Sequence, residues 1–232
     1  MNQKPYVLLI APHAPPRNGA EAIQVRRILK ELDIQATGRL ITVAPEAASW
    51  VHHDASLELK LNHFDTQSLR LPFHRLTSRV FMSQRFRLFH MPDSLCWIQL
   101  QAGTVIKQLT KKPDILYSRS FPLSAALLAR GLKKQLSIPW IMHLSDPWAD
   151  SPFTLPDRRH AKLEAACFEQ ANLITLTAQG QADFYKNKYP QFANKIIVLP
   201  NVMPDVEESG KWVQHLLAAD DRLHIVFAGS LY

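Results

Sequence analysis

The sequence predicts an α/β protein whose core is a doubly wound, mainly parallel sheet with helices on both faces. Short runs of consecutive apolar residues alternate with longer stretches of helical periodicity along the chain. Runs without polar alternation are typical of strands that are buried on both faces. A regular alternation of strand and helix brings successive strands parallel to one another, with the helices packed on the two faces of the sheet.

The individual elements follow from these patterns in chain order. The first apolar run, 6–11, is followed by closely spaced prolines that force a loop, and then by a helix with one apolar stripe. Asp93 or Ser94 is expected to cap a helix that ends before Pro113. Helices are predicted over 20–32, 95–109, 122–135, 158–171 and 179–188. Strands are predicted over 6–11, 40–44, 115–118, 139–144, 173–176, 196–199 and 223–228, with a short edge strand where Leu57, Leu59 and Leu61 alternate.

The composition is ordinary for a globular protein. The chain has 232 residues, of which 47% are hydrophobic and 20% are charged, so a disordered chain is excluded. No apolar run approaches the roughly 18–20 residues of a membrane span, and the N-terminal apolar run is too short for a signal peptide. We therefore expect a cytoplasmic protein. Cys96 and Cys167 are too few for a disulfide framework and are expected to be buried free thiols.

Several common site motifs are absent from the sequence. No glycine pattern fits a dinucleotide-binding fingerprint or a phosphate-binding P-loop. No serine lies in the G-x-S-x-G turn of a hydrolase, and the histidines lack the spacing of metal ligands. No acidic pair suited to Mg²⁺ beside a diphosphate is visible. We therefore expect neither a metal nor a cofactor.

The excess of positive charge is local. The formal net charge is +7, and the stretch 66–92 has no Asp or Glu but contains five arginines with interleaved phenylalanines. Ser68–Met91 could form a basic amphipathic helix that binds an anionic membrane surface. The alternative is an ordinary solvated helix over a local core. Nucleic acid is the weaker interpretation, because the charge is confined to one segment.

Polar residues at the carboxyl ends of the predicted strands are the candidate site residues, because ligands of such sheets bind there. Asn18 and Gly19 precede a helix whose N-terminal N–H groups suit an anion, unless they form only a tight turn. Arg119 could bind a phosphate or pair with a neighbouring loop. Asp146 could orient a hydroxyl group or act as a base, or it could only cap its loop. His143 lies at the same strand end and could equally be a packed side chain.

Five passages of the sequence belong together: PPRNGAEAIQVRR (15–27), PDSLCW (92–97), PDILYSRSFP (113–122), IPWIMHLSDPWADSP (138–152) and IVFAGSLY (225–232). In this order they make the chain similar to the N-terminal half of a GT-B glycosyltransferase of the family 4-like type. The segment Asp146-Pro147-Trp148, just after a strand, is the most specific part of them. Relatives often have an acidic residue in place of His143 and an arginine in place of Ser145, so this chain departs from the family there.

The resemblance implies an enzyme in which two Rossmann-like domains face each other across a cleft. The N-terminal domain would hold the acceptor, and the C-terminal domain would hold a nucleotide-sugar donor. The site residues that the resemblance implies are Asp146 and His143 for catalysis, Asn18, Gly19 and Arg119 for acceptor binding, and Gly229 and Ser230 for donor binding.

By the same resemblance, residues 1–204 would form the acceptor domain, 205–222 a linker and helix, and 223–232 the first strand of the donor domain. We expect sugar transfer from a nucleotide-sugar to a cell-envelope or polysaccharide acceptor, lipid-linked or saccharide, at the inner face of the membrane. The chain alone is expected to be inactive. Two alternatives stay open: a non-catalytic binding module for a phosphorylated ligand, and another GT-B-type enzyme such as a nucleotide-sugar epimerase.

Overall fold

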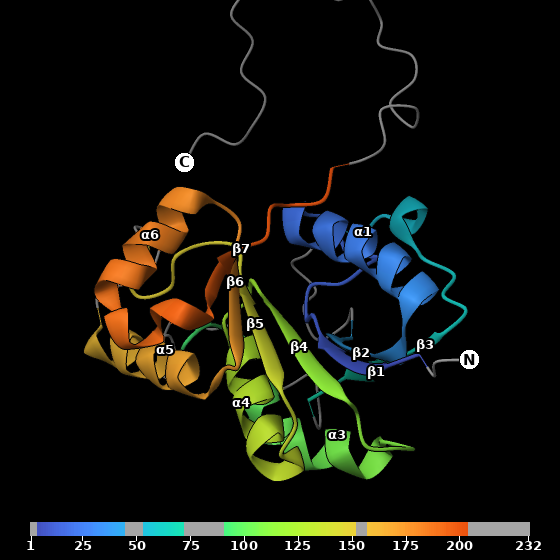
Figure 1. Ribbon diagram of the computed structural model, residues 1–232. Helices are drawn as coiled ribbons and strands as arrows, with labels where there is room; N and C mark the ends of the chain where they lie inside the picture. Colours follow the sequence, from blue (N-terminus) through green and yellow to red (C-terminus); the bar gives the residue numbers. More distant parts are fainter. Residues whose placement is uncertain (1–3, 45–52, 72–90, 152–156, 204–232) are drawn as a thin grey trace, which may run out of the picture. The chain divides into compact units, whose positions relative to one another are not determined.

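A parallel sheet organises the part of the chain that the computed structural model describes, which comprises residues 4–44, 53–71, 91–151 and 157–203. The sheet has seven strands in the order β3-β2-β1-β4-β5-β6-β7, and every neighbouring pair is parallel (Figure 1). The predicted fold class is therefore confirmed. The strands are β1 (Tyr6–Ile10), β2 (Thr37–Val43), β3 (Phe64–Leu69), β4 (Ile115–Ser120), β5 (Trp140–Leu144), β6 (Leu173–Leu176) and β7 (Ile196–Val198).

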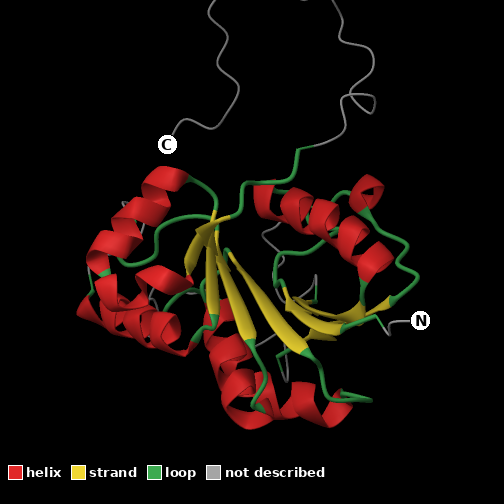
Figure 2. Ribbon diagram, viewed as in Figure 1, coloured by secondary structure: helices red, strands yellow, loops and turns green. Residues whose placement is uncertain are grey.

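Helices cover the sheet on both faces (Figure 2). Because side chains alternate across a strand, successive residues of β1 enter two different cores. Val7 and Leu9 pack with residues of α1, whereas Leu8 and Ile10 belong to a larger core that includes α4, α5 and α6. The α-helices are α1 (Ala20–Gln35), α3 (Ala102–Gln108), α4 (Ser124–Leu136), α5 (Arg158–Gln170) and α6 (Gln179–Lys188), and the 3₁₀ helices are η2 (Ala55–Leu57), η4 (Cys96–Gln101) and η5 (Pro190–Lys195).

The predicted edge strand around Leu57, Leu59 and Leu61 is wrong. Residues 55–57 form η2, and the edge strand is β3. Leu59 and Leu61 pack against the core on the α1 side, which explains their apolar alternation without a strand. In β3 only the two end residues are buried, because one sheet edge and much of its surface face solvent, so the strand has no apolar run to predict it from.

The predicted helix after residue 93 is in part a 3₁₀ helix. The prediction of Asp93 or Ser94 as its cap is wrong, because Leu95 is the N-cap residue of η4; Asp93 Oδ1 instead accepts a hydrogen bond from the Leu95 amide at 2.9 Å, and η4 and α3 follow in sequence. The same carboxylate accepts hydrogen bonds from the Ser124 amide at 2.8 Å and the Ser124 hydroxyl at 2.5 Å. Asp93 therefore ties the segment before η4 to the start of α4, and its place in the PDSLCW passage has a structural explanation.

Other sequence-based expectations divide between confirmed and untested ones. Cys96 and Cys167 are buried and form no disulfide within the described part of the chain, as predicted. Among the described residues no helix has the length and apolar character needed to cross a membrane. Met1–Val202 group into one compact unit. The predicted segments 205–222 and 223–232, with Gly229 and Ser230, and the basic stretch apart from residues 68–71 and 91, lie outside the described residues.

Candidate active site

The carboxyl edge of the sheet has its switch point between β1 and β4. From this central pair the strand order runs outward in both directions (Figure 1). The helix after β1 packs on one face and the helix after β4 packs on the other. Open α/β sheets bind their ligands where the strand order reverses in this way. The switch point is therefore where a candidate site has to be sought.

A buried ion pair crosses this edge. Glu21, in the first turn of α1, accepts a hydrogen bond from Arg119 Nε at 2.8 Å through Oε1 and one from the Ser145 hydroxyl at 2.8 Å through Oε2. The Arg119 side chain is 1% exposed and that of Glu21 is 13% exposed. Burial raises the pKa of Glu21, and the charge of Arg119 acts in the opposite direction. One carboxylate thus connects the helix after β1 with the end of β4 and the loop after β5.

Arg119 and His143 lie beside each other on neighbouring strands, where their Cα atoms are register partners. The Nδ1 atom of His143 is 2.9 Å from the hydroxyl of Thr175 on β6. Burial, and to a lesser degree the charge of Arg119, lowers the pKa of His143 to about 3, so the ring is neutral near pH 7. In the described part of the chain neither Arg119 Nη2 nor His143 Nε2 has a hydrogen-bond partner.

Four of the site residues predicted from the sequence lie around the first turn of α1, namely Asn18, Gly19, Arg119 and Asp146. Gly19 is the N-cap residue of this helix, and both it and the preceding Asn18 are exposed. Asp146 is exposed as well and lies close enough to Glu21 for its charge to contribute to the raised pKa of that residue. Arg119 is buried and forms an ion pair with Glu21. For this residue the structure therefore shows the ion pair that the sequence offered as the alternative to phosphate binding. The chemical roles assigned to these residues stay predictions.

The loop that carries Asp146 is anchored by Trp148. Its side chain is fully buried, and its indole N–H donates a hydrogen bond to His160 Nδ1 at 3.0 Å. The Trp148 amide donates a hydrogen bond to the Tyr185 hydroxyl at 2.8 Å. Burial lowers the pKa of His160, which keeps a neutral acceptor nitrogen available for the indole. The tryptophan beside Asp146-Pro147 therefore holds the loop on α5 and α6.

A second anchor of the same loop is the buried carboxylate of Glu164 on α5. Its Oε2 accepts hydrogen bonds from the Ala149 amide and the Tyr185 hydroxyl, both at 2.9 Å. Its Oε1 accepts hydrogen bonds from Lys188 Nζ at 2.6 Å and from the Tyr189 hydroxyl at 2.8 Å. The side chain is completely buried, so these four donors replace its hydration. Asp146 thus lies just before two residues, Trp148 and Ala149, that α5 and α6 hold in place.

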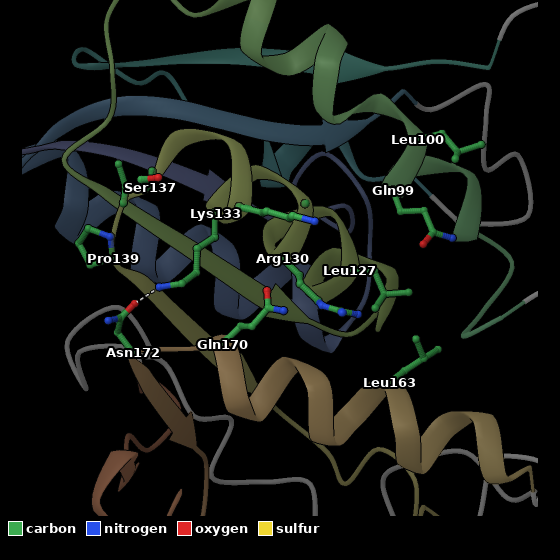
Figure 3. Close-up of a pocket in the computed structure, with 13 residues that line it drawn as sticks. Gln99, Leu100, Leu127, Arg130, Lys133, Ser137, Pro139, Leu163, Gln170 and Asn172 are labelled. Carbon is green, nitrogen blue, oxygen red and sulfur yellow. Dashed lines mark hydrogen bonds between the residues drawn. The ribbon is translucent and has the colours of Figure 1, made fainter.

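A basic groove of about 850 Å³ lies away from this site (Figure 3). Pro139 and Asn172, which line it, precede β5 and β6, so the groove is at the amino ends of these strands. Lys133, on α4, donates a hydrogen bond to the side chain of Asn172. Arg130 lines the groove near Lys133 without joining the network at the opposite edge.

Two important residues of the site were not identified from the sequence. Glu21 and Glu164 lie within helical patterns, where a glutamate is ordinarily exposed. A signal was available for Glu21 alone, because a carboxylate in the first turn of a helix is a common partner for nearby donors. Within the described residues no cluster of three or more His, Cys, Asp or Glu side chains is arranged to hold a metal ion.

Comparisons with known proteins agree with this architecture. A solved structure of the catalytic domain of starch synthase IV from Arabidopsis thaliana, bound to ADP and acarbose, is similar with a TM-score of 0.60 and 14% identity, over 86% of this chain and 52% of that one. UDP-GlcNAc 2-epimerase from Methanocaldococcus jannaschii has a TM-score of 0.48 and 10% identity, over 86% of this chain and 46% of that one. A Glycyrrhiza uralensis UGT enzyme complexed with glycyrrhetinic acid 3-O-monoglucuronide has a TM-score of 0.45 and 11% identity, over 85% and 48%. The chain thus spans about half the length of these proteins.

No match to the chain was found among curated proteins. The family of the glycosyl transferase 4-like domain, in contrast, matches residues 11–202. This range begins just after β1 and extends beyond β7, so it includes the switch point, the Glu21–Arg119 ion pair and the loop of Asp146. The sheet order, the site at its carboxyl edge and the family match together show that the chain belongs to the glycosyl transferase 4-like domain family.

Proposed function

We propose that this chain provides the acceptor side of a glycosyltransferase that moves a sugar from a nucleotide-sugar to a cell-envelope or polysaccharide acceptor. The observation that carries the proposal is the exposed carboxylate of Asp146 on a loop that Trp148 and Glu164 hold in place. A catalytic group needs such a fixed position, because misplacement by about 1 Å can lower a rate about 100-fold.

In this proposal Asp146 contacts the acceptor. Its carboxylate orients the attacking hydroxyl group and accepts its proton as the new glycosidic bond forms, while the nucleoside diphosphate departs with the bonding electron pair. Asn18 and Gly19 lie on the exposed side of the same helix start, and an added Cβ on Gly19 would meet nothing within 4 Å, which leaves open space for a ligand. These two residues are the proposed approach point for the acceptor.

Arg119 and His143 act in the proposal as positioning residues. Both are buried, so they act on the acceptor through their neighbours rather than by contact. Arg119 holds Glu21, and Glu21 holds the Ser145 hydroxyl directly before Asp146. A neutral His143 adds no second positive charge beside Arg119 that would compete for Glu21.

A nucleotide-sugar donor is the second part of the proposal. The starch synthase structure, about half of which is similar to this chain, was solved with ADP and acarbose. We propose that a nucleotide-sugar also serves this protein, with a donor-binding part that includes Gly229 and Ser230. The acceptor is proposed to be a saccharide or lipid-linked saccharide, with Ser68–Met91 as a contact to an anionic membrane surface.

The test compares Asp146→Asn with Asp150→Asn in the full-length protein. Both substitutions remove one exposed carboxylate from the same loop, and Asp150 forms a partly exposed ion pair with Lys188. We expect turnover with a nucleotide-sugar panel to fall about 100-fold or more in Asp146→Asn, as general-base catalysis contributes about 10²–10⁴-fold. The Asp150→Asn variant should keep its turnover, and both should keep the melting temperature. Unchanged turnover in Asp146→Asn would refute the proposed role.

A further inference from the structure

A cavity of about 260 Å³ lies between α1, the strands β2 and β3, and the segment before β3. It is separate from the ion pair of Glu21, and none of the residues discussed above as catalytic or positioning lines it. Arg17, which directly precedes Asn18, is among the residues that do. Leu29, Leu40, Leu59 and Leu61 form its apolar part.

Arg17 is an unusual side chain for such a place. It is only 2% exposed, and its Nη2 donates a hydrogen bond to the Val43 carbonyl at 2.9 Å. Its Nη1 is buried and has no hydrogen-bond partner in the described part of the chain. No acidic side chain of the described residues forms an ion pair with Arg17, and an unpaired buried charge is costly; burial lowers the pKa of Arg17 to about 10. The group stays charged near pH 7, so one strong donor next to the cavity is left for a ligand.

Hydroxyl groups continue this polar side of the cavity. Thr42 of β2 and Ser68 of β3 are register partners, and Thr66 lies two residues before Ser68 on the same face of the strand. All three line the cavity, but the Thr42 hydroxyl donates its proton to the Pro12 carbonyl at 3.2 Å, so the donors left for a ligand are those of Thr66 and Ser68. Thr66 and Ser68 are exposed, so the cavity is accessible from solvent at β3. Glu58 also lines it and is exposed, but it forms no ion pair with Arg17 in the described structure.

The segment that closes the cavity is held at both ends. At one end His53 forms an isolated β-bridge with Arg17, and the Asp54 amide donates a hydrogen bond to the Pro16 carbonyl at 2.8 Å. At the other end Asp33 of α1 accepts hydrogen bonds from the amides of Asn62 and His63, at 2.8 and 2.7 Å. The cavity is therefore a formed part of the fold rather than a gap beneath a loose loop.

We propose that this cavity binds a carboxylate or phosphate group of a small saccharide, with Arg17 as its charge partner and the hydroxyls of Thr66 and Ser68 as further hydrogen-bond donors. A guanidinium group suits both anions, because its donors match two of their oxygens at once. The cavity is slightly smaller than typical small-molecule sites of roughly 300–1,000 Å³, which suits one small anionic unit. The cavity itself supports an anion site, and the identification of the anion as part of a saccharide acceptor rests on the proposed function.

The test is a titration of the chain, followed by NMR, with inorganic phosphate, glucuronate and the uncharged control glucose. We expect phosphate or glucuronate to shift the amide signals of Ala14, Arg17 and Thr42, and glucose to leave them unchanged. The tighter of the two anions identifies the acceptor as phosphorylated or as a uronate. An anion beside Arg17 also offsets the charge that, together with burial, lowers the pKa of His13 to about 4, so the His13 titration should move to higher pH.

Three variants decide the assignment. Arg17→Gln should weaken anion binding more than tenfold, or by about 1.4 kcal/mol. Arg130→Gln removes the same charge in the distant groove and should leave binding unchanged. Arg17→Gln also loses the hydrogen bond to the Val43 carbonyl, so a second variant tests the site without disturbing that contact. Thr66→Glu adds a carboxylate at an exposed position, which should repel the anion and also weaken binding more than tenfold.

Absence of shifts with both anions in the folded chain would overturn the proposal. Equal affinity in the wild type and in Thr66→Glu would overturn it too. These binding experiments need no sugar transfer, so their failure is distinct from a failure of the Asp146 test.

Discussion

Replacing Glu164 by Gln should destabilise the protein strongly, because the carboxylate is completely buried and each of its two oxygens accepts two hydrogen bonds. The substitution preserves the size of the side chain but removes its charge and one acceptor oxygen. The new NH₂ group then faces two donors, either Ala149 and Tyr185 or Lys188 and Tyr189. The change therefore breaks about half of the network without creating a cavity.

The size of the effect follows from these contacts. A hydrogen bond to a charged partner contributes about 1.5–3 kcal/mol, so two lost bonds correspond to about 3–6 kcal/mol. The side chain of Lys188 is 22% exposed, and water can solvate part of its unpaired charge. We therefore expect the free energy of unfolding to fall by about 3–4 kcal/mol, near the lower limit for a broken buried pair. The melting temperature should fall by about 6–16 °C, at roughly 2–4 °C per kcal/mol.

Urea denaturation followed by circular dichroism measures this loss. Glu169→Gln is the matched control, because Glu169 lies on the same helix α5 with an exposed side chain. The control should change the free energy of unfolding by less than about 0.5 kcal/mol. A loss below about 1 kcal/mol in Glu164→Gln, or an equal loss in both variants, would refute the reasoning about the buried network.

Three further outcomes are expected. In Gly38→Ala the new Cβ would lie 2.3 Å from the Val7 carbonyl oxygen and 2.4 Å from Phe64 Cε1, so the free energy of unfolding in urea should fall by about 1–3 kcal/mol or more. Gly103→Ala, in open space on α3, should raise the free energy of unfolding by about 0.5–1 kcal/mol. Equal urea midpoints for the two variants would contradict this prediction. The pKa of His143 is lowered to about 3 from an ordinary 6.5, so the stability that the neutral ring contributes is complete above pH 6.5 and is lost as the pH falls towards 3, at about 1.4 kcal/mol per pH unit. Urea denaturation between pH 7 and 4 should therefore show that the free energy of unfolding depends less steeply on pH in His143→Gln than in the wild type. An identical pH dependence in both proteins would contradict this prediction. Burial raises the pKa of Cys167 to about 12 and also raises that of Cys96, so a thiol reagent at pH 8 should label neither residue until the protein is unfolded, and fast labelling of the native protein would show that the thiols are accessible.

The sequence was sufficient to predict the regular elements of the central sheet. The bounds of β6 and α6 are those predicted, and the remaining buried strands differ from their predictions only at their ends. Buried strands of a parallel sheet need apolar residues at successive positions, and helices need an apolar stripe, so both patterns are local properties of the chain. The same local logic predicted that Asn18, Gly19 and Asp146 would lie beyond strand ends, because the topology brings those ends to one edge.

Tertiary structure alone decided how the polar side chains are paired. Arg119 and Glu21 are separated by 98 residues, and the clamp on Ala149 comes from Glu164 and α6. Arg17 has the sequence pattern of an exposed loop residue, yet the fold buries it beside a cavity. The edge strand β3 was missed for a related reason, since its partner is a neighbouring strand and its own residues are mostly polar. Apolar periodicity specifies which face of an element is buried, whereas a hydrogen-bond partner depends on which distant elements the folded sheet brings within about 3 Å.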